Sequence, residues 1–149
     1  MIIPDANLLL YAYDSDSPFN KVAQSWWSDC LSGDETIGLC EVVLYSFIRV
    51  GTNAKAFAKP FSIEEVSSIV LSWLAVPSTE LITGEALDVE QALALLQNAG
   101  TGGNLTTDAQ IASLSLKYQA IVHTADTDFM RFPNVDWYNP ILNQSSAKN

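Results

Sequence analysis

Basic residues are scarce in this sequence. Its 149 residues include seven lysines and arginines against 17 aspartates and glutamates, so the net charge at neutral pH is −10. A protein that holds nucleic acid through charge alone has a basic surface, and this composition excludes that mode of binding. Either no nucleic acid binds to the chain, or a metal ion brings the positive charge that the side chains lack.

Cysteine is also rare. Cys30 and Cys40 are not spaced as metal ligands, and we expect two buried free thiols in a reducing cytoplasm rather than a disulfide. The apolar start of the chain has no basic segment before it and is interrupted by Asp5, so we expect no signal peptide. No apolar run approaches the length of a membrane span, so we expect no membrane partner.

What the sequence does have is enough apolar residues, 48% of the total, for one folded domain. We expect that domain over residues 1–142 and a polar, frayed tail over residues 143–149. The predicted strands cover residues 2–3, 36–39, 81–82, 121–123 and 135–138, and the predicted helices cover residues 17–32, 40–50, 63–74, 85–98 and 105–118. This alternation predicts an α/β protein with a parallel sheet and helices on both faces.

Four acids stand at the ends of predicted elements. Asp5 follows the first strand and Asp126 the fourth, while Glu41 and Asp108 each lie in the first turn of a helix. In open α/β sheets, sites form at the carboxyl ends of the strands, where the strand order reverses. Each acid also has a simpler interpretation, because first-turn acids favour the helix dipole and Asp126 could form a turn.

Taken together, these acids predict a carboxylate cluster with no basic neighbour in the sequence. Mutual repulsion in such a cluster raises the pKa values of the carboxyls or recruits a cation, and hard oxygen ligands suit Mg²⁺ or Mn²⁺. The chain offers no plausible Ser–His or Cys–His pair as a nucleophile and base. We expect its one histidine, His123, to pack within its strand, and we expect the tryptophans to pack rather than to stack bases.

Four sites carry a resemblance to a known family: IPDANLLLYA at residues 3–12, Glu41, GNLTTDA at residues 103–109 and TADTDF at residues 124–129. In order and spacing they are similar to the motifs of the PIN-domain ribonucleases, in particular the VapC toxins of VapBC toxin–antitoxin systems. The resemblance covers nearly the whole chain. It implies a three-layer, flavodoxin-like parallel sheet of about five strands in the order 3-2-1-4-5.

The same resemblance implies roles for particular residues. It implies a quartet that is both catalytic and metal-binding: Asp5, Glu41, Asp108 and Asp126. Asp128 would be an accessory acid, and Asn7 and Thr124 would hold carboxylates in place through hydrogen bonds.

The function implied is that of a Mg²⁺-dependent endoribonuclease, with Mn²⁺ as an alternative cation, that acts in the cytoplasm as the toxin of a bacterial type II toxin–antitoxin pair. Its partners would be RNA and a small antitoxin that places a basic side chain against the acids. Whether the chain forms a homodimer stays open.

Two other functions stay open at this point. A haloacid-dehalogenase-like phosphatase also has an aspartate after its first strand, but it needs a second aspartate two residues later, where this chain has Asn7. A non-catalytic, PIN-like module would bind a protein partner instead of cleaving RNA. The four intact acids argue against such a degenerate domain.

Overall fold

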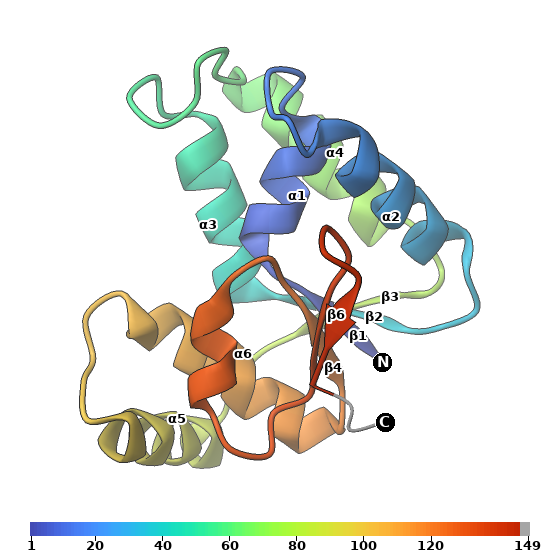
Figure 1. Cartoon of the computed structure of the whole chain (residues 1–149). Coiled ribbons are helices and arrows are strands. Elements are labelled where there is room, and N and C mark those ends of the chain that lie inside the picture. Colours follow the sequence, from blue (N-terminus) through green and yellow to red (C-terminus); the bar gives the residue numbers. More distant parts are fainter. Residues whose placement is uncertain (147–149) are drawn as a thin grey trace.

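The computed structural model describes residues 1–146, which form a twisted sheet between two groups of helices (Figure 1). The strands are β1 (Ile2–Pro4), β2 (Ile37–Cys40), β3 (Thr79–Ile82), β4 (Ile121–His123), β5 (Trp137–Asn139) and β6 (Gln144–Ser145). They lie in the order β3-β2-β1-β4-β5-β6. The first five strands are parallel, so the predicted order 3-2-1-4-5 is confirmed, and β6 adds an antiparallel edge strand that we had not predicted.

The helices are α1 (Ala6–Tyr13), α2 (Asn20–Ser32), α3 (Glu41–Gly51), α4 (Ile63–Leu74), α5 (Ala86–Ala99) and α6 (Leu105–Tyr118), and a 3₁₀ helix, η1 (Thr127–Arg131), follows β4. In Figure 1, α1 to α4 cover one face of the sheet and α5 and α6 cover the other. Helices on both faces are what the sequence predicted. Within the described residues, no helix has the length and apolar character needed to cross a membrane.

The sequence analysis placed some elements wrongly. It left α1 unassigned, and it began the next helix at Ser17, whereas α2 begins at Asn20. The Ser17 hydroxyl accepts a hydrogen bond from the Phe19 backbone N–H over 3.1 Å, which closes a turn before the helix instead of capping it. Part of the expected frayed tail is ordered, because residues 144–145 form β6, while residues 147–149 lie outside the described residues.

The core above the sheet is an aromatic cluster that joins four helices. Trp73 of α4 is 1% exposed, and its ring lies 4.7 Å from Phe47 of α3 and 5.6 Å from Trp27 of α2, between centroids. Its indole N–H donates to the Tyr13 hydroxyl of α1 over 2.9 Å. Trp26, Trp27 and Trp73 are all buried, as predicted.

The expectations for cysteine and histidine are confirmed as well. Cys30 and Cys40 are free and buried, and burial raises the pKa of each thiol to about 12, so both are inert. His123 accepts a hydrogen bond at Nδ1 from the Trp26 indole over 2.9 Å, and burial lowers its pKa to about 4. It is therefore a neutral, packed histidine at physiological pH.

Strand pairing brings distant parts of the chain to one edge of the sheet. β1 lies at the centre, with Ile2 opposite both Ile37 of β2 and Ile121 of β4. Because these strands are parallel, their carboxyl ends meet at the same edge. The residues that follow β1, β2 and β4 are therefore the ones that this edge can assemble into a site.

Candidate active site

Asp5 lies at the end of the central strand and is almost fully buried, with 7% of its surface exposed. Its backbone N–H donates to the His123 carbonyl over 2.9 Å, so β1 and β4 fix its position together. Burial is the main cause that raises the pKa of Asp5 to about 6, and the charge of Asp126 adds to the rise. The carboxylate is therefore held where its own charge is unfavourable.

Hydrogen bonds from Thr124 and Asn7 orient the Asp5 carboxylate. The Thr124 hydroxyl donates to Asp5 Oδ2 over 2.7 Å, and Asn7 Nδ2 donates to the same oxygen over 3.0 Å. The Thr124 oxygen also accepts the Asp126 N–H over 2.9 Å, and Asn7 Oδ1 accepts the Ala125 N–H over 3.3 Å. This network ties the start of α1 to the loop after β4.

Asp108 points into the site from α6, in the helix's first turn, and is 9% exposed. Burial is the main cause that raises its pKa to about 7, and the charges of Asp5, Asp126 and Asp128 contribute to the rise, in that order. The simple interpretation of an exposed first-turn acid is therefore wrong for Asp108.

Asp126 and Asp128 complete the cluster from the loop after β4. One carboxylate oxygen from each of Asp108, Asp126 and Asp128 lies within 4.8 Å of the others. Asp126 also caps η1, because its Oδ1 accepts the Asp128 N–H over 2.9 Å. One expectation needs correction: the cluster does have a basic neighbour, since Arg131 Nη1 lies 3.7 Å from Asp128 Oδ1.

Glu41 stands apart from these four aspartates. It begins α3 directly after β2, at the same edge of the sheet, but its side chain is exposed. None of the hydrogen bonds or ion pairs described for residues 1–146 joins it to the aspartates. The structure therefore assembles Asp5, Asp108, Asp126 and Asp128, and leaves Glu41 at the rim.

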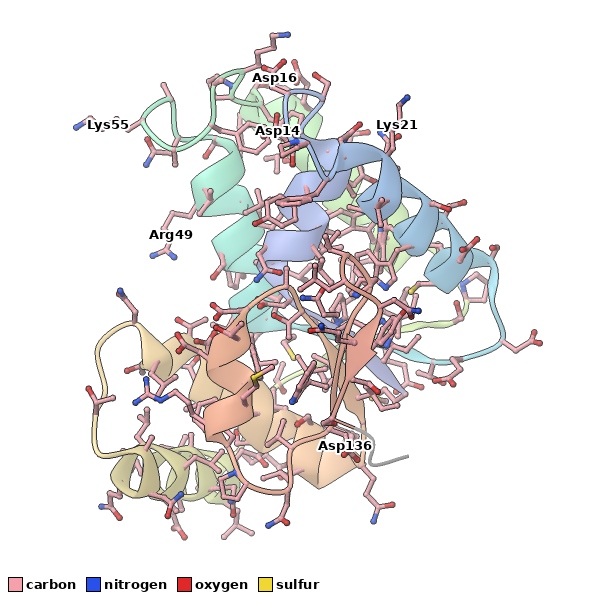
Figure 2. The ribbon with its side chains drawn as sticks, viewed as in Figure 1. Asp14, Asp16, Lys21, Arg49, Lys55 and Asp136 are labelled. Atoms are coloured by element: carbon pink, nitrogen blue, oxygen red, sulfur yellow. The ribbon has the colours of Figure 1, made fainter. Side chains whose placement is uncertain are left out.

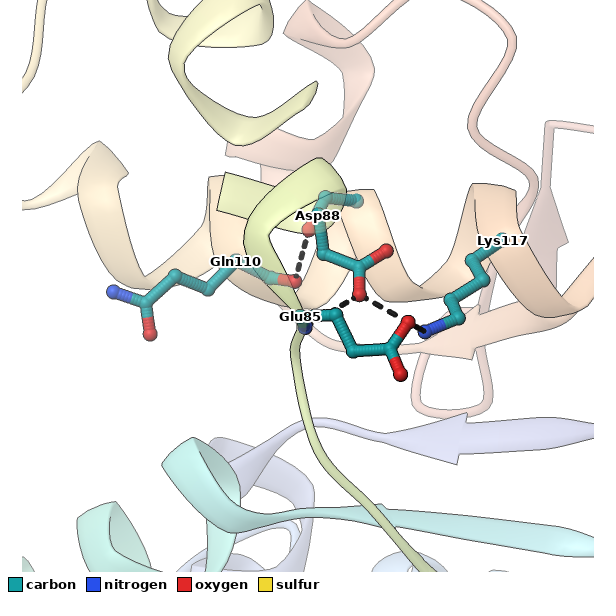
Figure 3. A network of polar contacts seen from close by, with 5 residues as sticks. Glu85, Asp88, Gln110 and Lys117 are labelled. Atoms are coloured by element: carbon teal, nitrogen blue, oxygen red, sulfur yellow. Dashed lines mark hydrogen bonds and ion pairs between the residues drawn. The ribbon is translucent and has the colours of Figure 1, made fainter. Parts of the chain in front are cut away.

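Glu41 also borders a cavity of about 290 Å³ between α5 and α6. The cavity is mostly apolar, with Val89, Leu93 and Leu96 of α5 on one wall. Figure 3 shows how the start of α5 is held to α6: Lys117 Nζ lies 3.0 Å from Asp88 Oδ2 and 3.1 Å from Glu85 Oε2.

The two ion pairs of Lys117 hold the start of α5, which lines the cavity, against α6. Burial raises the pKa of Asp88, but the Glu85 N–H and Lys117 together lower it below its ordinary value. Lys117 is therefore committed to these acids and is not free to neutralise the aspartates of the site.

The four aspartates fit a divalent cation. All the available donors are carboxylate oxygens, which Mg²⁺ and Mn²⁺ prefer, and three of them are already close enough to share one ion. Two of the acids are buried and share no ion pair with a basic side chain in the described part of the chain. Removing such carboxylates from water without a counter-charge is costly, so a cation stabilises the cluster.

We expect Thr124→Val to reduce catalysis roughly 10- to 100-fold, as loss of a partner that orients a metal ligand typically does. Valine has a similar shape but leaves the Asp5 carboxylate and the Asp126 N–H without their shared partner. Thr124→Ser keeps the hydroxyl and should retain most of the activity. Equal values of kcat for the valine and serine variants would show that this hydroxyl does not position Asp5.

A parallel sheet in the order 3-2-1-4-5 with a cluster of aspartates at its carboxyl edge indicates a metal-binding α/β protein. The family model described as PIN domain matches residues 2–135. The match covers most of the sequence, so the chain belongs to the PIN domain family.

Its relatives within that family are VapC ribonucleases. The chain is 40% identical over 141 residues to Ribonuclease VapC33 of Mycobacterium tuberculosis, across 95% of this chain and 99% of the relative. It is 36% identical over 140 residues to Ribonuclease VapC37 of the same species, across 94% and 97% of the two chains. The resemblance to VapC toxins that the motifs carried is confirmed.

Solved structures show the same fold. The crystal structure of Mycobacterium tuberculosis VapC20, described as a Sarcin-Ricin loop cleaving toxin, matches with a TM-score of 0.69 at 15% identity, over 91% of this chain and 98% of that one. VapBC2 from Rickettsia felis, bound to a DNA fragment from its promoter, matches with a TM-score of 0.67 at 23% identity, over 93% and 98%. At these identities the likeness concerns the fold alone.

Proposed function

We propose that this protein is a Mg²⁺-dependent endoribonuclease and the toxin of a bacterial type II toxin–antitoxin pair. The observation that carries the proposal is the convergence of Asp5, Asp108, Asp126 and Asp128 at one edge of the sheet, with Asp5 and Asp108 buried. The names of the VapC relatives support the choice of RNA as the substrate. The two free, inert thiols suit a reducing cytoplasm.

The chain's own residues in this proposal bind and orient. Asp5, Asp108, Asp126 and Asp128 would hold the cation, and Glu41 would join them from the rim as the fifth acid. Thr124 and Asn7 keep Asp5 in one orientation. A cation held by these residues would neutralise the scissile phosphate and lower the pKa of a water molecule. Attack of that water at phosphorus would break the P–O3′ bond, and it would leave a 3′-hydroxyl on one product and a 5′-phosphate on the other.

The test is cleavage of a short single-stranded RNA by the purified chain. We expect cleavage in Mg²⁺ or Mn²⁺, none in EDTA, and recovery when the cation is restored. The cut ends should carry a 3′-hydroxyl and a 5′-phosphate. Cleavage that persists in EDTA would exclude the metal mechanism, and release of phosphate from small phosphomonoesters without any RNA cleavage would favour a phosphatase.

The toxin role has its own test. Solved structures with the same fold include the toxin–antitoxin complex from Klebsiella pneumoniae and VapBC-1 from nontypeable Haemophilus influenzae. We expect expression of this chain to arrest bacterial growth, and co-expression of the small protein encoded beside it to restore growth. An arginine of that antitoxin would pair with the aspartates, because guanidinium binds carboxylates bidentately. Harmless expression of a chain that cleaves RNA in vitro would contradict the toxin role.

A further inference from the structure

The exposed face of α3 carries a tyrosine and an arginine in line with Glu41. Glu41, Tyr45 and Arg49 are spaced four residues apart, so successive members lie one turn apart on the same side of the helix. All three side chains are exposed. These three residues are called the α3 ridge below. The ridge starts at the edge of the sheet where the aspartates converge and runs away from it.

Tyr45 presents an aromatic ring to solvent, with 67% of its surface exposed. The other aromatic residue of this helix, Phe47, is fully buried in the aromatic cluster, so Tyr45 is not part of the core. An exposed aromatic ring can stack on any nucleobase, because every base has a π-face. Tyr45 therefore has the chemistry of a stacking platform one helical turn from Glu41.

Arg49 is a free cation in a chain that has few. Within residues 1–146, three basic side chains have a carboxylate partner within 4.0 Å: Lys59, Lys117 and Arg131. The other three in this part of the chain form no such pair: Lys21, Arg49 and Lys55.

Figure 2 shows Arg49 projecting outward from α3, whereas Lys21 and Lys55 lie at the opposite end of the molecule from Asp136. Of these three, Arg49 alone belongs to a helix that begins at the acidic edge. A phosphate that follows the helix away from the aspartates therefore meets Arg49.

The spacing along the helix suits a single strand. With a rise of 1.5 Å per residue, Tyr45 lies about 6 Å and Arg49 about 12 Å along the axis from Glu41. A strand whose cleaved phosphate lies at the aspartates, and which leaves along α3, passes Tyr45 and then Arg49 within a few nucleotides. Arginine binds a phosphate with two parallel hydrogen bonds, which fixes the strand's position as well as its charge.

We propose that the α3 ridge is the track for the single-stranded RNA that flanks the cleaved bond, with Tyr45 stacking on a base and Arg49 binding a backbone phosphate. This inference rests on the proposed function and deepens it, because it names the residues that hold the substrate. The cavity between α5 and α6 does not fit this role. Its lining is mostly apolar and includes no lysine or arginine, so it offers no cation to a backbone phosphate.

RNA affinity is the first measurement. It uses the full chain slowed by Asp126→Asn, in Ca²⁺, with a short fluorescent single-stranded RNA as the probe. We expect Tyr45→Ala to weaken binding roughly 10- to 100-fold, the range typical of a lost base–aromatic stack, and Tyr45→Phe to bind like the parent. Leu71→Ala is the matched control, because Leu71 is similarly exposed, at 64%, on α4. It should leave the affinity unchanged.

The salt dependence of RNA binding measures the contribution of the Arg49 charge separately from that of Tyr45. Arg49→Gln should weaken binding and make the slope of log affinity against log salt shallower by about 0.7, the contribution of one phosphate contact on a single strand. Lys21→Gln removes an equally free charge from α2 and should leave both quantities unchanged. An unchanged slope in Arg49→Gln, or an equal change in Lys21→Gln, would overturn the role of Arg49.

A small substrate separates this inference from the proposed function. Bis(p-nitrophenyl) phosphate has a phosphodiester but no base and no flanking phosphate, so Tyr45→Ala and Arg49→Gln, otherwise unmodified, should cleave it at the parent rate while kcat/KM on RNA falls. If the parent cleaves neither substrate in Mg²⁺ or Mn²⁺, both proposals fail. If the parent cleaves RNA and the ridge variants match it, the ridge alone is wrong. Variants that change self-association or antitoxin binding but not RNA affinity would make the ridge a protein interface and overturn the proposal.

Discussion

Asp5→Asn should abolish RNA cleavage and stabilise the metal-free protein at the same time. Asparagine keeps an oxygen that can accept from Thr124 and Asn7, so the loop after β4 stays in place. It removes a charged ligand from the centre of the acid cluster. Since a bound metal ion contributes several kcal/mol to the stabilisation of the transition state, we expect the rate to fall by roughly 10³-fold or more.

The stabilisation follows from the pKa of Asp5. Its value in the folded protein is raised, mainly by burial, from 3.8 to about 6, which corresponds to roughly 3 kcal/mol of unfavourable ionisation at neutral pH. The folded state therefore binds a proton more tightly than the unfolded state. The free energy of unfolding of the metal-free protein should be highest near pH 4 and should fall as the pH rises to about 6 for Asp5 and about 7 for Asp108.

Urea unfolding in EDTA across pH 4 to 8 measures how the free energy of unfolding depends on the ionisation of Asp5 and Asp108. The parent should lose stability over this range, Asp5→Asn should lose less, and Mg²⁺ should restore the parent at neutral pH. Asp34→Asn, which removes an exposed acid from the loop after α2, should behave like the parent in cleavage and in unfolding. Cleavage by Asp5→Asn near the parent rate in Mg²⁺ would show that the site is assigned wrongly.

Trp73→Ala should cost about 3–5 kcal/mol of the free energy of unfolding, the usual range for removing a buried tryptophan. The substitution empties the middle of the aromatic cluster and takes the donor away from the Tyr13 hydroxyl. This loss is a large part of the total stability of about 5–15 kcal/mol that is usual for a protein of this size. The melting temperature should fall by roughly 10–20 °C, because each kcal/mol lost lowers it by a few degrees.

The contacts of Trp73 join α4 to α1, α2 and α3. Asp5 directly precedes α1, so this core also supports the helix that follows the site. Trp73→Phe, which refills part of the cluster, should lose less stability than the alanine variant. Leu71→Ala, on the exposed side of the same helix, should change stability by less than about 0.5 kcal/mol. A loss below about 1 kcal/mol in Trp73→Ala would mean that α4 contributes little to this core.

Much of the fold could be predicted because the pattern of the central strands is simple. β1 and β4 are short apolar runs that end at an acid or a threonine, and α6 was predicted with the bounds that the structure shows, since its helical pattern ends before a strand. α1 was missed because it is short and almost wholly apolar, so it shows no polar face, and because it has no acid in its first turn and no base in its last turn. β6 was missed because its two residues are polar and pair only at the sheet edge, which periodicity does not reveal.

The sequence predicted which aspartates come together better than it predicted the contacts that they make. Asp5, Asp108 and Asp126 were predicted from their places at the ends of elements, and the structure brings them together with Asp128. The Arg131–Asp128 pair was not predicted, because it depends on the 3₁₀ turn of η1 that places the two side chains on one side. The exposure of Glu41 also follows from the packing of α3 against its neighbours, which no local pattern encodes.

The pairing of β1 with β4 has a consequence for how the protein is made. Ribosomes extend a chain from its N-terminus at about 5–20 residues per second, and Asp126 is translated 121 residues after Asp5. Thr124, which orients Asp5, is translated just as late. A nascent chain therefore cannot complete the acid cluster before the loop after β4 has left the ribosome, and fragments that end before this loop should not cleave RNA.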